Sequence, residues 1–137
     1  MNNPTVIQAK RYGIYSCRCK TALLSAARLM SQEDISALVV VEDDGFLCGI
    51  ITRTDLLRAK LDQPDRWTTE SVENWMSCEV VTVSPNAHLD EVARLLLDRQ
   101  IHRVVAVEEE NGKQRPLAVI SAADLVYHMS KEHQTES

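Results

Sequence analysis

Apolar side chains recur at regular spacings along the chain, and the same order of spacings occurs twice. Residues 23–30 carry them three and four positions apart, as do residues 89–96, which predicts two helices that each bury one face. Helix start signals lie just ahead of both segments, at Lys20-Thr21 and at Pro85-Asn86. Each copy of the pattern is therefore predicted to contain an amphipathic helix.

Each predicted helix leads into two apolar segments that are predicted to be strands. The first, at 37–41 or 104–107, is a continuous run rich in β-branched residues, which is typical of a strand buried on both faces. The second, at 46–52 or 116–121, follows a turn and leads into a short helix. Further short extended segments are predicted ahead of the helices, at 15–17 and 80–83.

The two copies align residue by residue. An offset of 66 positions superposes the first part of each copy, and after a three-residue insertion the offset becomes 69. A period of this length indicates two copies of one supersecondary unit. The insertion falls in the acidic segment 108–112, which we expect to form a hairpin loop because Asn-Gly and Asp-Gly are hairpin-turn sequences. The matched pairs include Val6 with Val72, Leu23 with Leu89, Ile51 with Ile120 and Asp55-Leu56 with Asp124-Leu125.

The repeat predicts a simple domain organisation: a first copy at residues 1–62, a polar linker at 63–71, a second copy at 72–130 and a polar tail at 131–137. A copy of roughly 60 residues buries too little apolar surface to fold well alone. We therefore expect the two copies to share a core across a pseudo-two-fold interface. The predicted fold class is α/β, of the mixed α+β kind.

Composition and charge exclude several classes of function. The 137 residues include 15 basic and 20 acidic side chains, a net charge of −5, so no global basic field attracts nucleic acid or an anionic membrane. The apolar runs are far shorter than the roughly 20 residues of a membrane-spanning helix. Residues 1–10 also lack the apolar run of a signal peptide, so we expect a soluble, cytoplasmic protein.

Motifs of the common enzyme classes are missing from the sequence. It contains no glycine-rich phosphate loop, no HExxH, no GxSxG and no Cys/His arrangement that would pair a nucleophile with an activated base. We therefore predict no catalytic residue and no enzyme activity.

The polar feature that recurs in both copies is a hydroxyl residue at a strand end, followed three positions later by a carboxylate. It comprises Thr52 with Asp55 in the first copy and Ser121 with Asp124 in the second. Hydroxyl, carboxylate and the unpaired N–H groups of the next helix then face one corner, which suits a ribose and a neighbouring anion. The same residues also form the capping-box pattern, which needs no ligand. Repetition does not separate the two interpretations, because a cap would repeat as well.

His102-Arg103 stands where the second copy passes from its helix to its buried strand, and Ser36-Ala37 holds the matching place in the first. Two adjacent cation-capable side chains predict a phosphate contact there, while a solvated strand end is an equally good interpretation. Residues expected at the surface or in apolar packing, without a chemical role, are His88, His128, His133, Trp75 and Met76.

The four cysteines are Cys17, Cys19, Cys48 and Cys78, and no two form a CxxC pair. Buried free thiols are the favoured interpretation, because free cysteine packs as a small apolar residue. Cys17 and Cys19 would point to one face of a strand, so a redox or metal device built on this pair is a third hypothesis. No metal site is predicted elsewhere.

The doubled order of apolar helix, buried strand, acidic glycine turn and Gly-Ile-Ile-Thr-x-x-Asp resembles the cystathionine β-synthase (CBS) domain, and two in tandem resemble a Bateman module. The likeness covers residues 6–130. Residues 72–76 are similar to the family's opening motif, and His102-Arg103 is similar to the phosphate-contacting pair in the γ subunit of AMP-activated protein kinase. The resemblance implies a β-α-β-β-α order in each copy and two clefts between the copies. It also implies adenosine-containing ligands: AMP, ADP, ATP or S-adenosylmethionine.

The same resemblance assigns roles to the residues of the two corners. Asp55 and Asp124 would hold the ribose, with Thr52 and Ser121 beside the ribose or the phosphate. Arg53 is counted with these nucleotide-binding residues.

The resemblance also predicts that the two sites are unequal. His102 and Arg103 would reach the phosphate of the nucleotide held by Asp55. The Asp124 site would face Ser36-Ala37, which offers no cation, and Ala118 replaces the family glycine there. We therefore expect one good nucleotide site at Asp55 and a weaker or empty one at Asp124.

The resemblance also implies a regulatory role: a homodimer that senses its ligand and signals to an unidentified partner protein. Ligand binding would favour one arrangement of the two copies, and a partner that prefers that arrangement would gain affinity by the same free energy. The alternative is a constitutive dimerisation or interaction module with vestigial clefts, in which Thr52 and Ser121 act only as caps.

Overall fold

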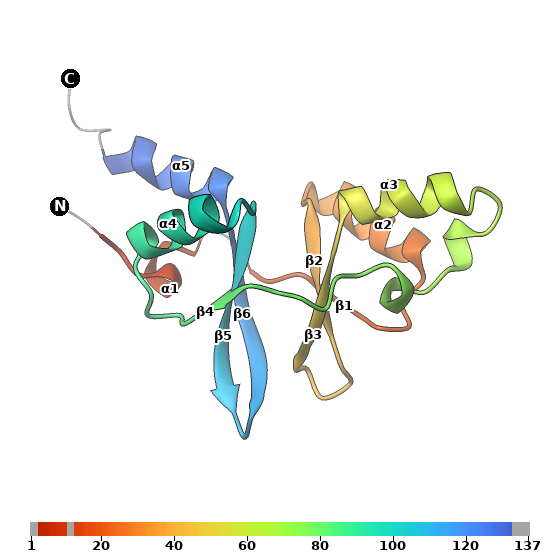
Figure 1. Cartoon of the computed structure of the whole chain (residues 1–137), viewed down its shortest axis with the longest axis horizontal. Helices are drawn as coiled ribbons and strands as arrows, with labels where there is room; N and C mark the ends of the chain where they lie inside the picture. The colour runs from red at the N-terminus through yellow and green to blue at the C-terminus, as the bar shows by residue number, and fades with distance from the viewer. Residues whose placement is uncertain (1–2, 11–12, 133–137) are drawn as a thin grey trace. The chain divides into compact units, whose positions relative to one another are not determined.

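The chain forms a mixed α+β structure made of two compact units. A computed structural model describes residues 3–10 and 13–132. Unit 1 takes in Met1–Ile14 and Val81–Ser137, and unit 2 takes in Tyr15–Val80 (Figure 1). Each unit holds one three-stranded sheet with its helices, which confirms the predicted α+β class and the predicted doubling.

Unit 2 contains the helix, strand, strand and helix of the first copy. Its sheet has the order β1-β2-β3, in which β1 runs parallel to β2 and β2 runs antiparallel to β3. The predicted strand 37–41 is the central strand, and the following hairpin closes through Gly45, whose φ of 89° requires a residue without a Cβ. The elements are β1 (Ser16–Arg18), α2 (Leu23–Glu33), β2 (Ala37–Val41), β3 (Leu47–Thr52), α3 (Arg53–Asp62) and the 3₁₀ turns η1 (Trp67–Thr69) and η2 (Val72–Asn74).

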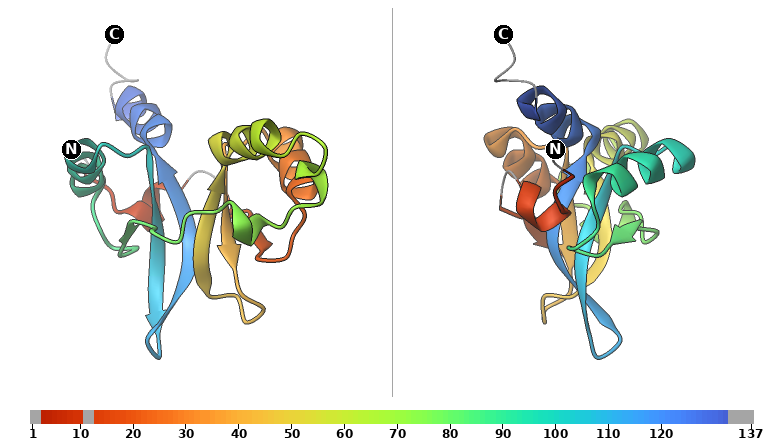
Figure 2. Two further views of the ribbon diagram at one scale, coloured as in Figure 1. Left: turned by 45° about the vertical axis from the view of Figure 1, so that its right-hand side comes forward. Right: turned by 90° about the vertical axis from the view of Figure 1, so that its left-hand side faces the viewer.

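Unit 1 repeats this topology with β4, β5 and β6 in the places of β1, β2 and β3. The β4–β5 pair is parallel and the β5–β6 pair is antiparallel, as Figure 2 shows from two further sides. The elements are α1 (Val6–Ala9), β4 (Thr82–Val83), α4 (Leu89–Arg99), β5 (Arg103–Glu110), β6 (Lys113–Ser121) and α5 (Ala122–Glu132).

Each unit has its own apolar core between its helices and its sheet. In unit 2 the α2 residues Leu23, Ala26 and Met30 pack with Leu38 and Val40 of β2. In unit 1 the corresponding set includes Leu89, Val92, Leu96, Val104 and Ala106. The predicted apolar stripes of both helices are therefore core faces, as the helical spacing indicates.

Exchange of the opening segments is a feature that the sequence pattern did not predict. Val6, near the start of the first copy, is fully buried in the core of unit 1, and its N–H donates to Ala87 O at 2.8 Å. Val72, the first residue of the second copy, is fully buried in the core of unit 2, and its N–H donates to Thr21 O at 2.9 Å. Each opening segment thus completes the core of the other copy.

The polar segment 63–71, expected to bridge the copies, contributes to unit 2. Its Trp67 packs against the unit 2 core, and Glu70 O accepts a hydrogen bond from Leu23 N at 2.9 Å. The residues of the predicted tail beyond Glu132 lie outside the described residues, and so does His133. No helix in the described part of the chain is both long and apolar enough to cross a membrane.

The three-residue insertion lies in a hairpin with an Asn-Gly turn, as predicted, but its residues lengthen the strands and not the loop. Glu108, Glu109 and Glu110 continue β5 and pair with 113–115 of β6. The turn itself is the two-residue Asn111-Gly112, with φ of 54° and 81°, the left-handed conformation that a tight hairpin turn requires. Cross-strand attraction favours the longer ladder, since Arg115 Nε donates to Glu110 Oε2 at 2.7 Å.

One predicted surface histidine also has a structural contact. His128 of α5 is half-buried, and its Nε2 lies 2.6 Å from the carbonyl oxygen of Ala9 in α1. This bond requires the Nε2–H form of the ring, and it attaches the opening segment to the last helix of unit 1. The sequence around His128 does not predict this contact, because Ala9 is 119 positions away. His88 is exposed, as expected.

Candidate functional site

The hydroxyl–carboxylate corner of unit 2 forms where β3 ends and α3 begins. Thr52 caps the helix in an extended conformation, and Asp55 occupies the third helical position. Thr52 N and Thr52 Oγ1 donate to Asp55 Oδ2 at 2.8 and 3.0 Å, and Asp55 N donates to Thr52 Oγ1 at 3.3 Å. The pair therefore forms the capping box, which satisfies N–H groups that a helix start leaves unpaired.

Unit 1 contains the same corner with the same dimensions. Ser121 N and Ser121 Oγ donate to Asp124 Oδ2 at 2.8 and 3.0 Å, and Asp124 N donates to Ser121 Oγ at 3.3 Å. The capping interpretation thus holds at both corners. A carboxylate that caps a helix can still accept further hydrogen bonds, because each of its oxygens has two acceptor positions.

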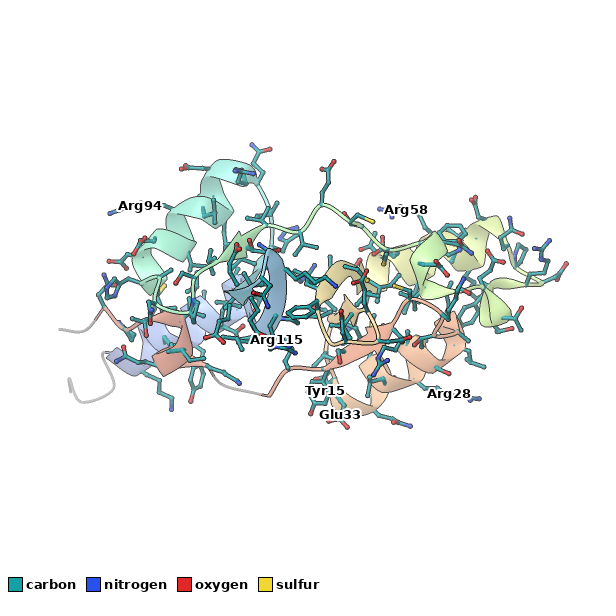
Figure 3. The ribbon with its side chains drawn as sticks, turned by 90° about the horizontal axis from the view of Figure 1, so that it is seen from below. Tyr15, Arg28, Glu33, Arg58, Arg94 and Arg115 are labelled. Carbon is teal, nitrogen blue, oxygen red and sulfur yellow. The ribbon has the colours of Figure 1, made fainter. Side chains whose placement is uncertain are left out.

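The surroundings of the two carboxylates differ. Asp55 is only 9% exposed, and its Oδ1 accepts a hydrogen bond at 2.9 Å from Nη1 of Arg58, one turn further along α3. The Arg58 side chain itself is 65% exposed, and it is labelled in Figure 3. Asp124 is half-buried, and Tyr127 occupies the position that matches Arg58. The unit 2 corner therefore pairs a buried carboxylate with a solvent-facing cation.

Arg53, the first residue of α3, lies next to this corner. Its Nη2 donates to Asp34 Oδ1 at 3.2 Å, and both side chains are largely exposed. Its backbone N–H donates to Ser36 O at 3.0 Å. The guanidinium is thus held by a surface ion pair, which contributes little to stability and is easily exchanged for another anion.

The predicted phosphate-binding pair lies beside the corner of unit 1. Arg103 is directly opposite Ser121 in the β5–β6 ladder, and His102 O accepts a hydrogen bond from Ala122 N at 3.1 Å. The structure therefore brings Arg103, His102 and Ser121 together with Asp124, and it places Thr52, Arg53 and Asp55 in unit 2. His102 and Arg103 lie in unit 1 and Asp55 lies in unit 2, so their predicted contact with the ligand of Asp55 stays a prediction.

Ser36-Ala37 holds the equivalent place beside Thr52, because Ala37 pairs with Thr52 in the β2–β3 ladder. Neither residue carries a positive charge, and Ser36 has further interactions of its own. The two corners are therefore similar but have different neighbours, as the sequence predicted: Ser36-Ala37 beside Thr52, and His102-Arg103 beside Ser121.

Trp75 and Met76 pack in the core of unit 2, which agrees with their predicted packing role. Trp75 Nε1 also donates to Glu70 Oε1 at 3.2 Å. Met76 lies against Gly49 of β3, where an added Cβ would stand 2.7 Å from Met76 Sδ and 2.8 Å from Ser77 O. Gly49 is thus needed for a close approach between β3 and the opening segment of the second copy.

Two surface cavities occupy equivalent places in the two units, away from the corners. One of about 470 Å³ lies in unit 2 where β1 and β2 end, and one of about 390 Å³ lies in unit 1 where β4 ends and the β5–β6 hairpin extends. None of the seven predicted nucleotide-binding residues lines either cavity. The first is lined by Arg18, Cys19, Lys20, Val41, Glu42, Asp43 and Asp44.

Comparison with known proteins supports the doubled architecture. The family model of the CBS domain matches residues 11–62 and again residues 72–131. A CBS domain-containing protein of Bacillus subtilis, YhcV, is 35% identical over 109 residues, which cover 78% of this chain and 73% of the relative.

Solved structures show the same fold. The CBS domain pair of protein MJ0100, in complex with 5′-methylthioadenosine and S-adenosyl-L-methionine, superposes with a TM-score of 0.82 at 21% identity, over 96% of this chain and 99% of that one. CBSX2 in complex with AMP superposes with a TM-score of 0.78 at 20% identity, again over 96% and 99% of the two chains.

Proposed function

Because the chain belongs to the CBS-domain family and carries two such domains, we propose that it is a regulatory module that binds an adenosine-containing ligand. AMP, ADP, ATP and S-adenosylmethionine are the candidate ligands. The proposed output is a change in affinity for a regulated protein in the cytoplasm. The observation that carries the proposal is the duplicated hydroxyl–carboxylate corner in a chain that two CBS domains nearly fill.

The ligands of related structures support an adenosine-containing molecule. MJ0100 holds 5′-methylthioadenosine and S-adenosyl-L-methionine, and CBSX2 holds AMP. These ligands share the adenine base and the ribose but differ in what the ribose 5′ carbon carries. The shared part is what a carboxylate corner can recognise, because ribose hydroxyls donate well to a carboxylate.

Asp55 is proposed as the ribose anchor of the main site. Its Oδ2 accepts the hydrogen bonds of Thr52, whereas its Oδ1 accepts a hydrogen bond from the exposed Arg58 side chain. An oxygen with a second acceptor position can take a ribose hydroxyl beside Arg58 or in its place. Burial of the carboxylate strengthens such a bond, since less water competes for it.

The two sites are proposed to differ in how they bind the phosphate or sulfonium group that the ribose of the ligand carries. Arg53, His102 and Arg103 are the basic residues assigned to the Asp55 ligand, and Thr52 lies beside it. At the second site, Ser121 and Asp124 would anchor a ribose without a cation from Ser36-Ala37. We therefore propose a dominant site at Asp55 and a weaker one at Asp124.

Thermal unfolding of the purified chain with a ligand panel tests this proposal. Adenosine, AMP, ADP, ATP, S-adenosylmethionine and GTP would each be added to the wild type, Asp55→Asn and Asp124→Asn. A ligand at 100 times its Kd adds about 2.7 kcal/mol to the free energy of unfolding, which raises the midpoint of a chain this small by several degrees. The expected result is a rise with an adenine ligand that Asp55→Asn abolishes and Asp124→Asn largely keeps.

Asp62→Asn is the matched control, because it removes the same charge from the exposed last position of α3. Asparagine at position 55 can still accept the bond from Thr52 N, so the variant tests the charge without removing the whole cap. Absence of any ligand-induced rise in the wild type would overturn the sensor and favour the interaction module.

The exposed apolar faces of α3 and α5 favour the interaction role, and we propose that they support a homodimer. Leu57 and Leu61 lie one turn apart on α3 and are exposed, and Val126 and Met129 form a similar pair on α5. The two helices are equivalents in the repeat, so both copies present an apolar face. Adjacent exposed apolar residues of this kind mark protein–protein contacts.

Light scattering after size exclusion tests the homodimer. Leu61 is 83% exposed, and Leu61→Glu is expected to reduce the mass from two chains to one. Leu97→Glu is the control, because Leu97 of α4 is 78% exposed and has no apolar companion in the exposed set on its helix. A wild-type mass of a single chain would contradict the homodimer and leave the ligand proposal untouched.

A further inference from the structure

Unit 2 contains all four cysteines of the chain, and two of them face each other. The sulfur of Cys19, just after β1, lies 3.0 Å from the sulfur of Cys48 in β3. The two residues are 29 positions apart in sequence: Cys19 follows β1, one outer strand of the sheet, and Cys48 lies in β3, the other outer strand. Both pack against the core of unit 2 and are half-buried.

A β-bulge explains how the side chain of Cys48 reaches this position. Val40 pairs with Gly49 and Val41 pairs with Leu47, so Cys48 is the extra residue of β3 at the point where the register shifts. An extra residue of this kind re-aims its side chain relative to the regular alternation of a strand. The bulge thus places a thiol of β3 next to the residue that follows β1.

We propose that Cys19 and Cys48 are a redox modification site that forms an intramolecular disulfide bond. The bond needs a sulfur–sulfur distance of about 2.05 Å, so the two sulfurs must approach by about 1 Å. With hydrogen peroxide as the oxidant, one thiolate attacks the peroxide oxygen and becomes a sulfenic acid with release of water. The second thiol then displaces the sulfenic hydroxyl as a second water. Two thiols and one peroxide give one disulfide and two waters.

The other two cysteines are less suited to pair with either member. Cys17 lies in β1 itself and is half-buried, while Cys78 is exposed beyond the Met76–Ser77 contact with β3. Neither has a sulfur partner among the hydrogen bonds of the described residues. Burial and the hydrogen bond with Cys19 raise the pKa of Cys48 to about 12, which lowers the fraction of Cys48 that is thiolate at neutral pH.

The bond would join three segments of unit 2 at one point. Cys19 O accepts a hydrogen bond from Glu73 N at 3.0 Å, and Lys20 forms an ion pair with Glu73 at 2.6 Å, so Cys19 is attached to η2. Cys48 precedes Gly49, which lies against Met76. A disulfide at this point would therefore fix the exchanged opening segment to β1 and β3. The unit 1 equivalents, Pro85 and Leu117, have no such chemistry.

Peptide mapping of the whole purified chain tests the proposal. The reduced protein would be treated with hydrogen peroxide, blocked with N-ethylmaleimide and digested without reductant. We expect one linked peptide pair containing Cys19 and Cys48, with a mass loss of about 2 Da for two hydrogens. Lys20 and Arg28 provide cleavage sites between the two cysteines, so a linked pair is distinguishable from a single peptide.

Three variants make the result decisive. The double variant Cys17→Ser with Cys78→Ser keeps only the proposed pair, and it is expected to form the same bond with a midpoint of thermal unfolding about 5 to 10 °C above that of its reduced form. Cys19→Ser and Cys48→Ser are expected to lose the bond and the rise. A linked peptide through Cys17 or Cys78, or only sulfinic acid at the pair, overturns the proposal. Since the double variant leaves the proposed pair intact, a failure of either single variant to fold does not decide the outcome.

Discussion

The two units have the same corner but different surroundings, and the contrast separates what the repeat fixes from what it leaves free. Thr52 with Asp55 and Ser121 with Asp124 make the same three hydrogen bonds at the same distances. Around that corner, unit 2 places Arg58 on the carboxylate, whereas unit 1 has Tyr127 at the matching position. Backbone geometry and helix capping are therefore common to both units, and the chemistry next to the carboxylate is specific to each.

A second contrast lies in the strand that leads to the corner. Gly49 of β3 lies against the opening segment of the second copy, and Ile50 N and Ser77 N each donate to the other residue's carbonyl oxygen at 2.9 Å. The equivalent residue of β6 is Ala118, which is buried in the core of unit 1. Unit 2 thus requires glycine at position 49, whereas unit 1 accommodates the methyl group of Ala118 at the equivalent position.

The largest expected effect follows from reversing this difference. Gly49→Ala would place a Cβ 2.8 Å from a backbone oxygen and 2.7 Å from Met76 Sδ, and we expect a loss of about 3 kcal/mol in the free energy of unfolding. Ala118→Gly removes one buried methyl group and adds backbone freedom, with an expected loss of about 1 kcal/mol. Urea unfolding of both variants measures the difference.

A neutral Gly49→Ala variant would contradict the close approach at this strand. Met76→Leu is a useful companion to it, because leucine is of similar size but lacks the sulfur atom that lies nearest the added Cβ. In the double variant Gly49→Ala with Met76→Leu, the added Cβ still lies too close to the oxygen of Ser77, so we expect only part of the lost stability to be recovered.

The exchanged opening segments provide the second way to test the comparison. Val6 and Val72 are both fully buried, Val6 in the core of unit 1 and Val72 in the core of unit 2. Val6→Ala and Val72→Ala are each expected to cost about 2 kcal/mol. Hydrogen exchange should then rise mainly in β5 and β6 for Val6→Ala, and mainly in β2 and β3 for Val72→Ala. The reverse assignment would contradict the exchange.

The helices, the strands and the repeat could be predicted from the sequence because their signals are local. The apolar spacing at 23–30 became α2, and the β-branched run at 37–41 became β2 with the same bounds. The two corners were predictable for the same reason, since hydroxyl and carboxylate stand three positions apart. Local patterns of this kind are what secondary structure depends on most directly.

Non-local features could not be predicted in this way. The burial of Val6 in the core of unit 1 and of Val72 in the core of unit 2 has no local signal, because it depends on contacts with residues far away in the sequence. The pairing of Cys19 with Cys48 depends on a bulge that shifts the register by one residue, and a bulge has no clear signature in composition. The ladder at 108–110 likewise depends on charge pairing across two strands.

Thiol reactivity is the third test, because the thiols of unit 2 stand where unit 1 has apolar residues. Burial raises the pKa of Cys17 to about 11 and that of Cys48 to about 12, and the matching residues are Val83 and Leu117. A pKa three units above the ordinary value lowers the thiolate fraction about 1,000-fold, while the greater nucleophilicity of a more basic thiolate recovers about 30-fold of this.

We therefore expect Cys48 to react with iodoacetamide at pH 7 about 30-fold more slowly than a thiol of ordinary pKa. Raising the pH deprotonates more of the thiol, so the rate should rise about tenfold per pH unit from pH 7 to pH 9, still below the pKa of about 12. Mass spectrometry of timed samples follows each cysteine separately. A rate for Cys48 that equals that of free cysteine and levels off near pH 9 would contradict the shielded dithiol.

The smallest expected effect concerns the corner that the two units share. Thr52→Ala and Ser121→Ala each remove a hydroxyl group that makes the same two hydrogen bonds, so each should cost about 1 kcal/mol in the free energy of unfolding. Equal losses would mean that the hydroxyl groups act as caps alone in the free protein. A loss at position 52 that exceeds the loss at position 121 would show that Asp55 and Arg58 depend on Thr52 for their position, and the comparison would then extend from the surroundings to the corner itself. Urea unfolding without ligand measures both variants, and repeating it with a saturating adenine ligand separates capping from binding, because only a binding role makes the loss at one corner grow with ligand.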